Sequence, residues 1–247
     1  MILDKRADLR HGDVKKLLFS LSVPTITSQI VNMLYNLVDR VFIGHMQPAE
    51  TVGKLALTGV GVCLPIIMVI SAFASLMAIG GAPRASIAEG AGESKKSERI
   101  MGNCLTMLVI TALVLTVLFE SFAEPLLLMF GASENTIGYA LDYMRIYALG
   151  TIFVQLTLGM NAYITAQGFA TVSMKTVLIG ALLNTALDPL FIFVLGLGVR
   201  GAALATVISG DLDLMLKLLF SRNIWIIGDR TIRELIIRNL ILILRVE

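Results

Sequence analysis

Two acidic residues, Asp39 and Asp188, lie inside apolar stretches that are long enough to cross a membrane. A carboxylate in the hydrocarbon core costs roughly 2.5–3.5 kcal/mol on insertion scales, so such residues usually bind or relay something. Asn184 precedes Asp188 by four residues, which places both side chains on one helical face. These residue types and this spacing indicate a cation or proton site within a helical bundle, as in a transporter.

The stretch that contains Asp39 also carries Gln29, Asn32 and Asn36. At 100° per residue the four side chains fall within an arc of about 80°, so they form a polar stripe on one side of an apolar helix. Such a stripe should face protein or a water-filled cavity rather than lipid. We therefore expect Gln29, Asn32 and Asn36 to face the substrate.

Two further polar residues should lie near the carboxylates. Counted at about 1.5 Å per residue, Thr206 reaches the outer half of the bilayer together with Asp39 and Asp188, whereas Asn161 lies deeper. Oxygens from carboxylates, an amide and a hydroxyl suit a hard cation such as Na⁺. Desolvation favours the protonated carboxyl, so the same groups could carry protons instead.

Each candidate has an alternative interpretation. Arg40 follows Asp39, so Asp39 could be an interfacial residue that pairs locally. Asp188 has no basic neighbour in sequence, and its alternative is a purely structural polar contact. Asn161 and Thr206, taken singly, are typical of polar residues that pack one membrane helix against another.

The composition is that of an all-α, polytopic membrane protein. Hydrophobic residues make up 56% and charged residues 15% of the 247, whereas soluble domains average about 25% charged residues. A membrane-spanning helix needs about 20 apolar residues. The sequence predicts helices near residues 15–44, 55–83, 100–119, 137–167, 175–199 and 201–210. We expect residues 1–209 to form one transmembrane lobe and residues 210–247 a charged tail, either amphipathic (231–246) or disordered.

The loop charges predict an orientation. The segments that precede the first, third and fifth helices carry ten Lys and Arg residues, and the segments on the opposite side carry four. Positive residues remain on the cytoplasmic side, so we expect a multi-pass cell-membrane protein with a cytoplasmic N-terminus.

Several strings resemble a known family. SVPTITSQIVNMLYNLVDRVFIGH (22–45) is similar to the first helix of multidrug and toxic compound extrusion (MATE) transporters. GMNAYITAQGFATVSM (159–174) is similar to the fourth helix region, and the N-x-x-x-D-P string at 184–189 lies in the fifth. The resemblance covers residues 13–209.

The resemblance implies an activity. MATE transporters export amphipathic, often cationic drugs by antiport against Na⁺ or H⁺, and two six-helix lobes enclose their cleft. Their first-lobe cation site corresponds here to Asp39, Asn184 and Asp188, and less closely to Thr206 and Asn161. The implied partners are the lipid bilayer and small amphipathic substrates. No cofactor beyond the coupling ion, no structural metal and no nucleic acid is expected, and no nucleophile–histidine arrangement suggests an enzyme.

The sequence departs from the family in its length, because a second lobe is missing and the family pattern ends near Ser209. We expect a truncated or frame-shifted half-transporter that would need a second lobe or a second copy. Two alternatives remain. One is a flippase for lipid-linked oligosaccharides, although the expected spans contain almost no Lys or Arg to meet pyrophosphate. The other is a truncated remnant that does not transport.

Overall fold

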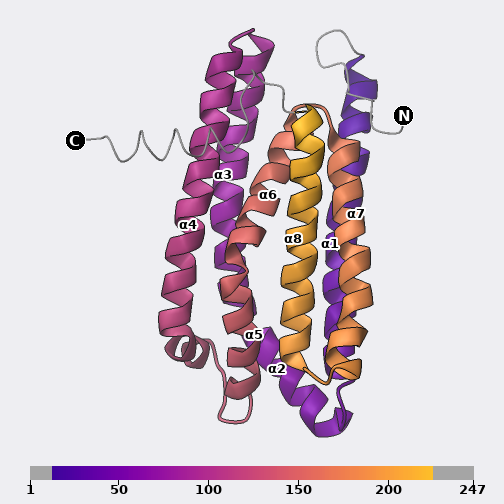
Figure 1. Ribbon diagram of the computed structural model, residues 1–247, viewed down its shortest axis with the longest axis vertical. Helices are drawn as coiled ribbons and strands as arrows, with labels where there is room; N and C mark the ends of the chain where they lie inside the picture. Colours follow the sequence, from indigo (N-terminus) through magenta and orange to yellow (C-terminus); the bar gives the residue numbers. More distant parts are fainter. Residues whose placement is uncertain (1–12, 225–247) are drawn as a thin grey trace, which may run out of the picture.

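The computed structural model describes residues 13–224, and this part of the chain consists of helices joined by short turns (Figure 1). The prediction of an all-α membrane protein is confirmed. The amphipathic or disordered segment expected within 225–247 lies outside the described residues.

Six segments run along the length of the bundle in the described range, and three of them are broken into shorter helices (Figure 1). In chain order they are α1 (Val14–Gly44); η1 (Ala49–Gly53), α2 (Lys54–Val62) and α3 (Leu64–Gly90); α4 (Ser94–Met129); α5 (Ile137–Leu149) and α6 (Thr151–Ala166); α7 (Ala170–Pro189) and η2 (Leu190–Val194); and α8 (Val199–Ile224). The α5–α6 pair is bent by 57°. Four of the segments over 13–224 are each long and apolar enough to cross a membrane, and the bent pair makes a fifth.

The sixth segment differs from its prediction. The helix expected over 201–210 continues to Ile224, so the expected boundary between 209 and 210 falls inside α8. The prediction was wrong because Asp213 and Lys217 do not end the helix. They are one turn apart and form an ion pair on its buried side, an arrangement that the helix accommodates.

The fifth segment has the predicted length of 25 residues but is shifted toward the N-terminus and begins at Ala170. It ends at Val194 rather than near residue 199. Gly196 and Gly198 follow with φ angles of 65° and 58°, in the left-handed region that glycine adopts without strain. These two residues turn the chain back into α8.

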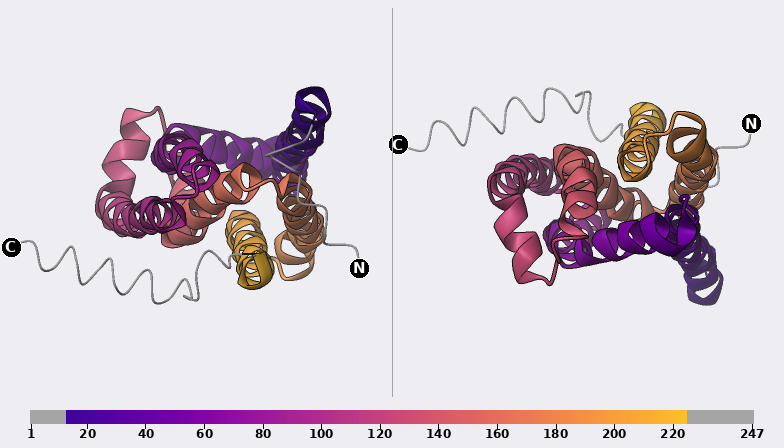
Figure 2. Two further views of the ribbon diagram at one scale, coloured as in Figure 1. Left: turned by 90° about the horizontal axis from the view of Figure 1, so that it is seen from above. Right: turned by 90° about the horizontal axis from the view of Figure 1, so that it is seen from below.

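The bundle has two outer helix pairs and two helices between them. α1 packs mainly on α7, α3 packs on α4 and α6, and α8 contacts α5, α6 and α7. Seen along the bundle axis, the α3–α4 pair lies on one side and the α1–α7 pair on the other, with α6 and α8 between them (Figure 2). Residues from α1, α6, α7 and α8 can therefore meet in the interior.

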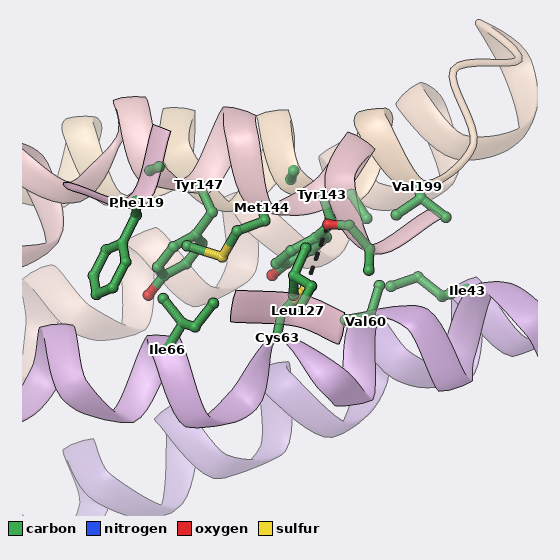
Figure 3. Close-up of a cluster of buried hydrophobic side chains, with 14 of the residues drawn as sticks. Ile43, Val60, Cys63, Ile66, Phe119, Leu127, Tyr143, Met144, Tyr147 and Val199 are labelled. Atoms are coloured by element: carbon green, nitrogen blue, oxygen red, sulfur yellow. Dashed lines mark hydrogen bonds between the residues drawn. The ribbon is translucent and has the colours of Figure 1, made fainter. Parts of the chain in front are cut away.

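An apolar core closes the end of the bundle where α2, α5 and the start of α8 meet. Figure 3 shows Tyr143, Met144 and Tyr147 of α5 facing the helices that carry Cys63 and Ile66. The Cys63 thiol donates a hydrogen bond to the Ala140 carbonyl at 3.4 Å. Aromatic side chains of α5 thus extend from this core toward the interior of the bundle.

The contact between α2 and α5 requires a glycine. A Cβ placed on Gly59 would lie 2.9 Å from the Thr136 carbonyl oxygen, whereas one placed on Gly61 would have no atom within 4 Å. We expect Gly59→Ala to lower the free energy of unfolding by about 1–3 kcal/mol, because the backbone of α5 must move. Gly61→Ala, two residues along α2, should be neutral or slightly stabilising. Thermal unfolding in detergent checks both, and equal effects would contradict this account.

Candidate functional site

The polar stripe of α1 opens into an interior cavity of about 270 Å³ between α1, α3, α5, α6, α7 and α8. Asn32, Asn36 and Asp39 line this cavity. Asn36 donates its Nδ2 hydrogen to the Asn32 carbonyl at 2.6 Å. Gln29 is exposed on α1 and is not among the lining residues, so the structure does not bring it to this cavity. The α1 lining begins at Asn32, about one turn farther along the helix.

Asn184 and Asp188 lie in the wall between α1 and α7 rather than on the open surface of the cavity. Asn184 is 1% and Asp188 0% exposed. Asn184 Nδ2 is 3.5 Å from Asp188 Oδ1, at the limit of a hydrogen bond. The charge of Asp188 interacts with that of Asp39 across the helix interface. The structure therefore brings together the three residues that the sequence placed in one site.

Asp39 is an interior residue. It is only 6% exposed, and no ion pair joins it to Arg40, although both residues lie within the described range. Arg40 lines the same cavity and attracts Asp39 at longer range. The local ion pair of that alternative is therefore not formed between these two described residues.

Three oxygen atoms of this group lack a hydrogen-bond donor among the described residues: Asp39 Oδ1, Asn184 Oδ1 and Asp188 Oδ2. Leaving a buried acceptor unpaired costs about 1–3 kcal/mol, and more when the group is charged. A proton on one carboxyl group, or a cation between the two, would remove that cost. Carboxylate and amide oxygens are ligand atoms that suit a small hard cation.

Thr206 and Asn161 both line the cavity, but they are oriented differently. Thr206 donates to the Ala202 carbonyl at 3.1 Å, and a hydroxyl oxygen that donates can still accept. The Asn161 amide oxygen already accepts a hydrogen bond from the Ser173 hydroxyl. Thr206 therefore presents an oxygen with remaining acceptor capacity to the cavity, whereas the Asn161 amide oxygen joins α6 to α7.

Besides Arg40, two charged residues of the cavity were not predicted. Asp213 and Lys217 of α8 line it, and Lys217 is fully buried. The sequence interpretation assigned both to a charged tail. Positions 206, 209, 213 and 217 are three or four residues apart. This spacing could have placed Asp213 and Lys217 on the same helical face as Thr206.

The comparisons with known proteins agree on one family. A sequence model of the MatE family matches residues 24–190. The multidrug export protein MepA of Staphylococcus haemolyticus (strain JCSC1435) is 30% identical over 214 residues, which are 86% of this chain and 46% of that protein. MepA of Staphylococcus aureus (strain NCTC 8325 / PS 47) is 26% identical over 79% of this chain and 42% of its own length.

Solved structures give the same result. A MATE protein crystallised in the bent conformation is similar with a TM-score of 0.82 and 27% identity, over 93% of this chain and 51% of that one. A transporter of the MOP superfamily from Pyrococcus furiosus, whose binding pocket is described as having reverse polarity, is similar with a TM-score of 0.78 and 27% identity over 92% and 49%. The chain spans about half the length of the relatives it matches.

Proposed function

Because this chain belongs to the MatE family of multidrug efflux transporters, we propose that it couples the movement of Na⁺ or H⁺ to the export of amphipathic, cationic organic compounds. The chain is a multi-pass membrane protein. The coupling ion and the class of substrate are parts of the proposal, and so is the transport activity of a chain of this length.

The observation that carries the proposal is the group of unpaired buried oxygens of Asp39, Asn184 and Asp188. They come from α1 and α7, the two helices that make the most extensive contact in the bundle. A proton or Na⁺ bound here would neutralise repulsion between two carboxylates and draw the two helices together. The binding of the ion would then alter the packing of the wall that encloses the cavity.

Coupling requires that the ion bind two conformations of the lobe unequally. A ligand with equal affinity for both conformations shifts nothing, however tightly it binds. Asp39 meets this requirement in principle, because it belongs to both the cation group and the cavity lining. A change in the contact between α1 and α7 would therefore alter the surface that a substrate meets.

The proposal includes an orientation and a partner. With the N-terminus in the cytoplasm of a cell-membrane protein, the Asp39–Asp188 end of the bundle lies toward the outer face. The relatives are about twice as long as this chain. We therefore propose that a second lobe or a second copy of the chain completes the substrate path, within the lipid bilayer.

A second candidate is the flipping of a lipid-linked, anionic oligosaccharide. The observation that favours it is the presence of Arg40 and Lys217 in the cavity, where the sequence predicted almost no basic residue. The charges of Arg40 and Lys217 are balanced by those of Asp39 and Asp213, which also line the cavity. Asp188, which interacts with Asp39, adds a third acidic group. The interior thus retains an excess of acidic groups, which favours cations over pyrophosphate.

The experiment has a binding stage and a transport stage. Purified chain in detergent should unfold at a higher temperature as Na⁺ replaces N-methylglucamine at constant ionic strength, or as the pH falls if the ion is H⁺. Proteoliposomes should then move ethidium against an imposed gradient of the same ion. Binding of neither ion would contradict the coupling proposal. Binding without transport would support the cation site and leave the non-transporting remnant as the better description of this chain alone.

A further inference from the structure

The buried ion pair of α8 lies inside the cavity but outside the cation group described above. Lys217 Nζ donates to Asp213 Oδ2 at 2.6 Å, and the two residues are 0% and 6% exposed. Both line the cavity, on the same face of α8 as Thr206 and Ser209. Asp213 lies about 10 Å along the helix from Thr206, at about 1.5 Å per residue.

The second carboxylate oxygen of Asp213 has no hydrogen-bond donor within the described part of the chain. Gly180 allows this position, because a Cβ on Gly180 would lie 3.2 Å from the Asp213 Cβ. The backbone of α7 therefore approaches α8 closely and holds the carboxylate at the cavity. Asp213 Oδ2 is thus paired with the Lys217 ammonium group. Asp213 Oδ1 is buried and could accept a hydrogen bond or bind a cation.

Asp213 shares one electrostatic neighbour with the carboxylates of the first group. The Tyr35 side chain of α1 lies within electrostatic range of Asp39, Asp188 and Asp213. Tyr35 itself lines the cavity. Tyr35 therefore lies within electrostatic range of carboxylates from α1, α7 and α8, and the Lys217 ammonium pairs with the one from α8, Asp213.

The energetics of buried pairs indicate that stability alone does not account for this one. Removing two charges from water costs several kcal/mol per ion, and apolar replacements of such pairs are often neutral or stabilising. A lysine ammonium is a compact charge on a flexible four-carbon stem with three donors. It can therefore leave its partner without any movement of the backbone.

We propose that Asp213 is a second cation-binding carboxylate of the cavity and that Lys217 competes, as a tethered cation, with the inorganic cation for it. The proposal rests on the proposed cation coupling. Tethering gives the ammonium an effective concentration in the millimolar range or above, so it weakens cation binding at Asp213 without abolishing it. A cation that is bound more weakly at Asp213 is released more readily, as transport requires.

The test measures Na⁺ binding to the purified full chain by calorimetry, with N-methylglucamine as the ionic-strength control. It uses Asp188→Asn as the background, so that the first cation group no longer contributes. Adding Lys217→Met should tighten Na⁺ binding about tenfold or more, because a competing positive charge in contact with the carboxylate is removed. Adding Asp213→Asn as a third change should abolish that gain.

The outcomes separate this inference from the proposed function. If Na⁺ affinity in the Asp188→Asn background is unchanged by Lys217→Met, or if the gain persists without Asp213, the tethered-competitor inference is overturned, whatever the native chain does. If native chain binds no Na⁺ and yet Lys217→Met creates Asp213-dependent binding, the inference stands and the first site fails.

A second variant covers the possibility of misfolding. Lys217→Gln keeps a donor for Asp213 Oδ2 and should show the same gain. If neither variant gives folded protein even when it is purified throughout in Na⁺, the inference is overturned, because Na⁺ at Asp213 should replace the lost counter-charge.

Discussion

Replacing Asp188 by asparagine should abolish cation-coupled ethidium movement while leaving membrane insertion and folding intact. The amide has nearly the same shape as the carboxylate, but it cannot exchange a proton or balance a bound cation. It also removes one of the two carboxylates whose charges interact across α1 and α7. Most of the protection from thermal unfolding by the coupling ion should be lost together with transport, because both depend on the first cation group and only the weaker binding at Asp213 remains.

The matched control is Asp142→Asn, the same chemical change at the surface. Asp142 is paired with Arg200 at 2.8 Å, and both side chains are substantially exposed. A surface ion pair of this kind contributes about 0–1 kcal/mol, so the variant should keep both transport and ion binding. Unchanged coupling in Asp188→Asn would remove Asp188 from the mechanism. An equal loss in both variants would show that the effect is not specific to the cavity.

Asp213→Asn should lower the free energy of unfolding by roughly 3–5 kcal/mol, because it leaves the fully buried Lys217 ammonium without its counter-charge. The change preserves the shape of the side chain, so packing against Gly180 is retained. The prediction does not depend on any transport activity. It can be checked by thermal or chemical unfolding in detergent micelles.

The double variant Asp213→Asn/Lys217→Met provides the control. Removing both charges leaves no buried ion, so most of the lost stability should return. The coupling energy in the double-mutant cycle then measures the interaction between the two side chains. If the double variant is as unstable as the single one, the buried pair is not the cause of the effect.

The helical segments and the residues of the first site could be predicted from the sequence because both depend on local patterns. Apolar length alone indicates a membrane helix, and a spacing of three or four residues places side chains on one face. This reasoning was sufficient to bring Asn32, Asn36 and Asp39 to a common cavity and to place Asn184 beside Asp188. It also predicted that Asp39, Asn184 and Asp188 lie between the first and fifth segments.

The same local reasoning failed where a residue has two possible environments. Charges at 211, 213 and 217 are equally typical of a helix end and of an interior ion pair, and only the packing of α8 against α6 and α7 distinguishes the two. Gln29 shares the arc of the stripe, but the neighbouring helices do not extend the cavity to it. Asn161 has a suitable depth, yet Ser173 of α7 takes its amide oxygen.

The sequence by itself determined the membrane class, the family resemblance and the presence of carboxylates inside apolar segments. The tertiary structure decided which of these polar groups meet, which are already satisfied, and that Lys217 is a cation inside the bundle. The physical reason is that helical phase is fixed within one segment, whereas the burial and pairing of a side chain depend on which other helix covers it.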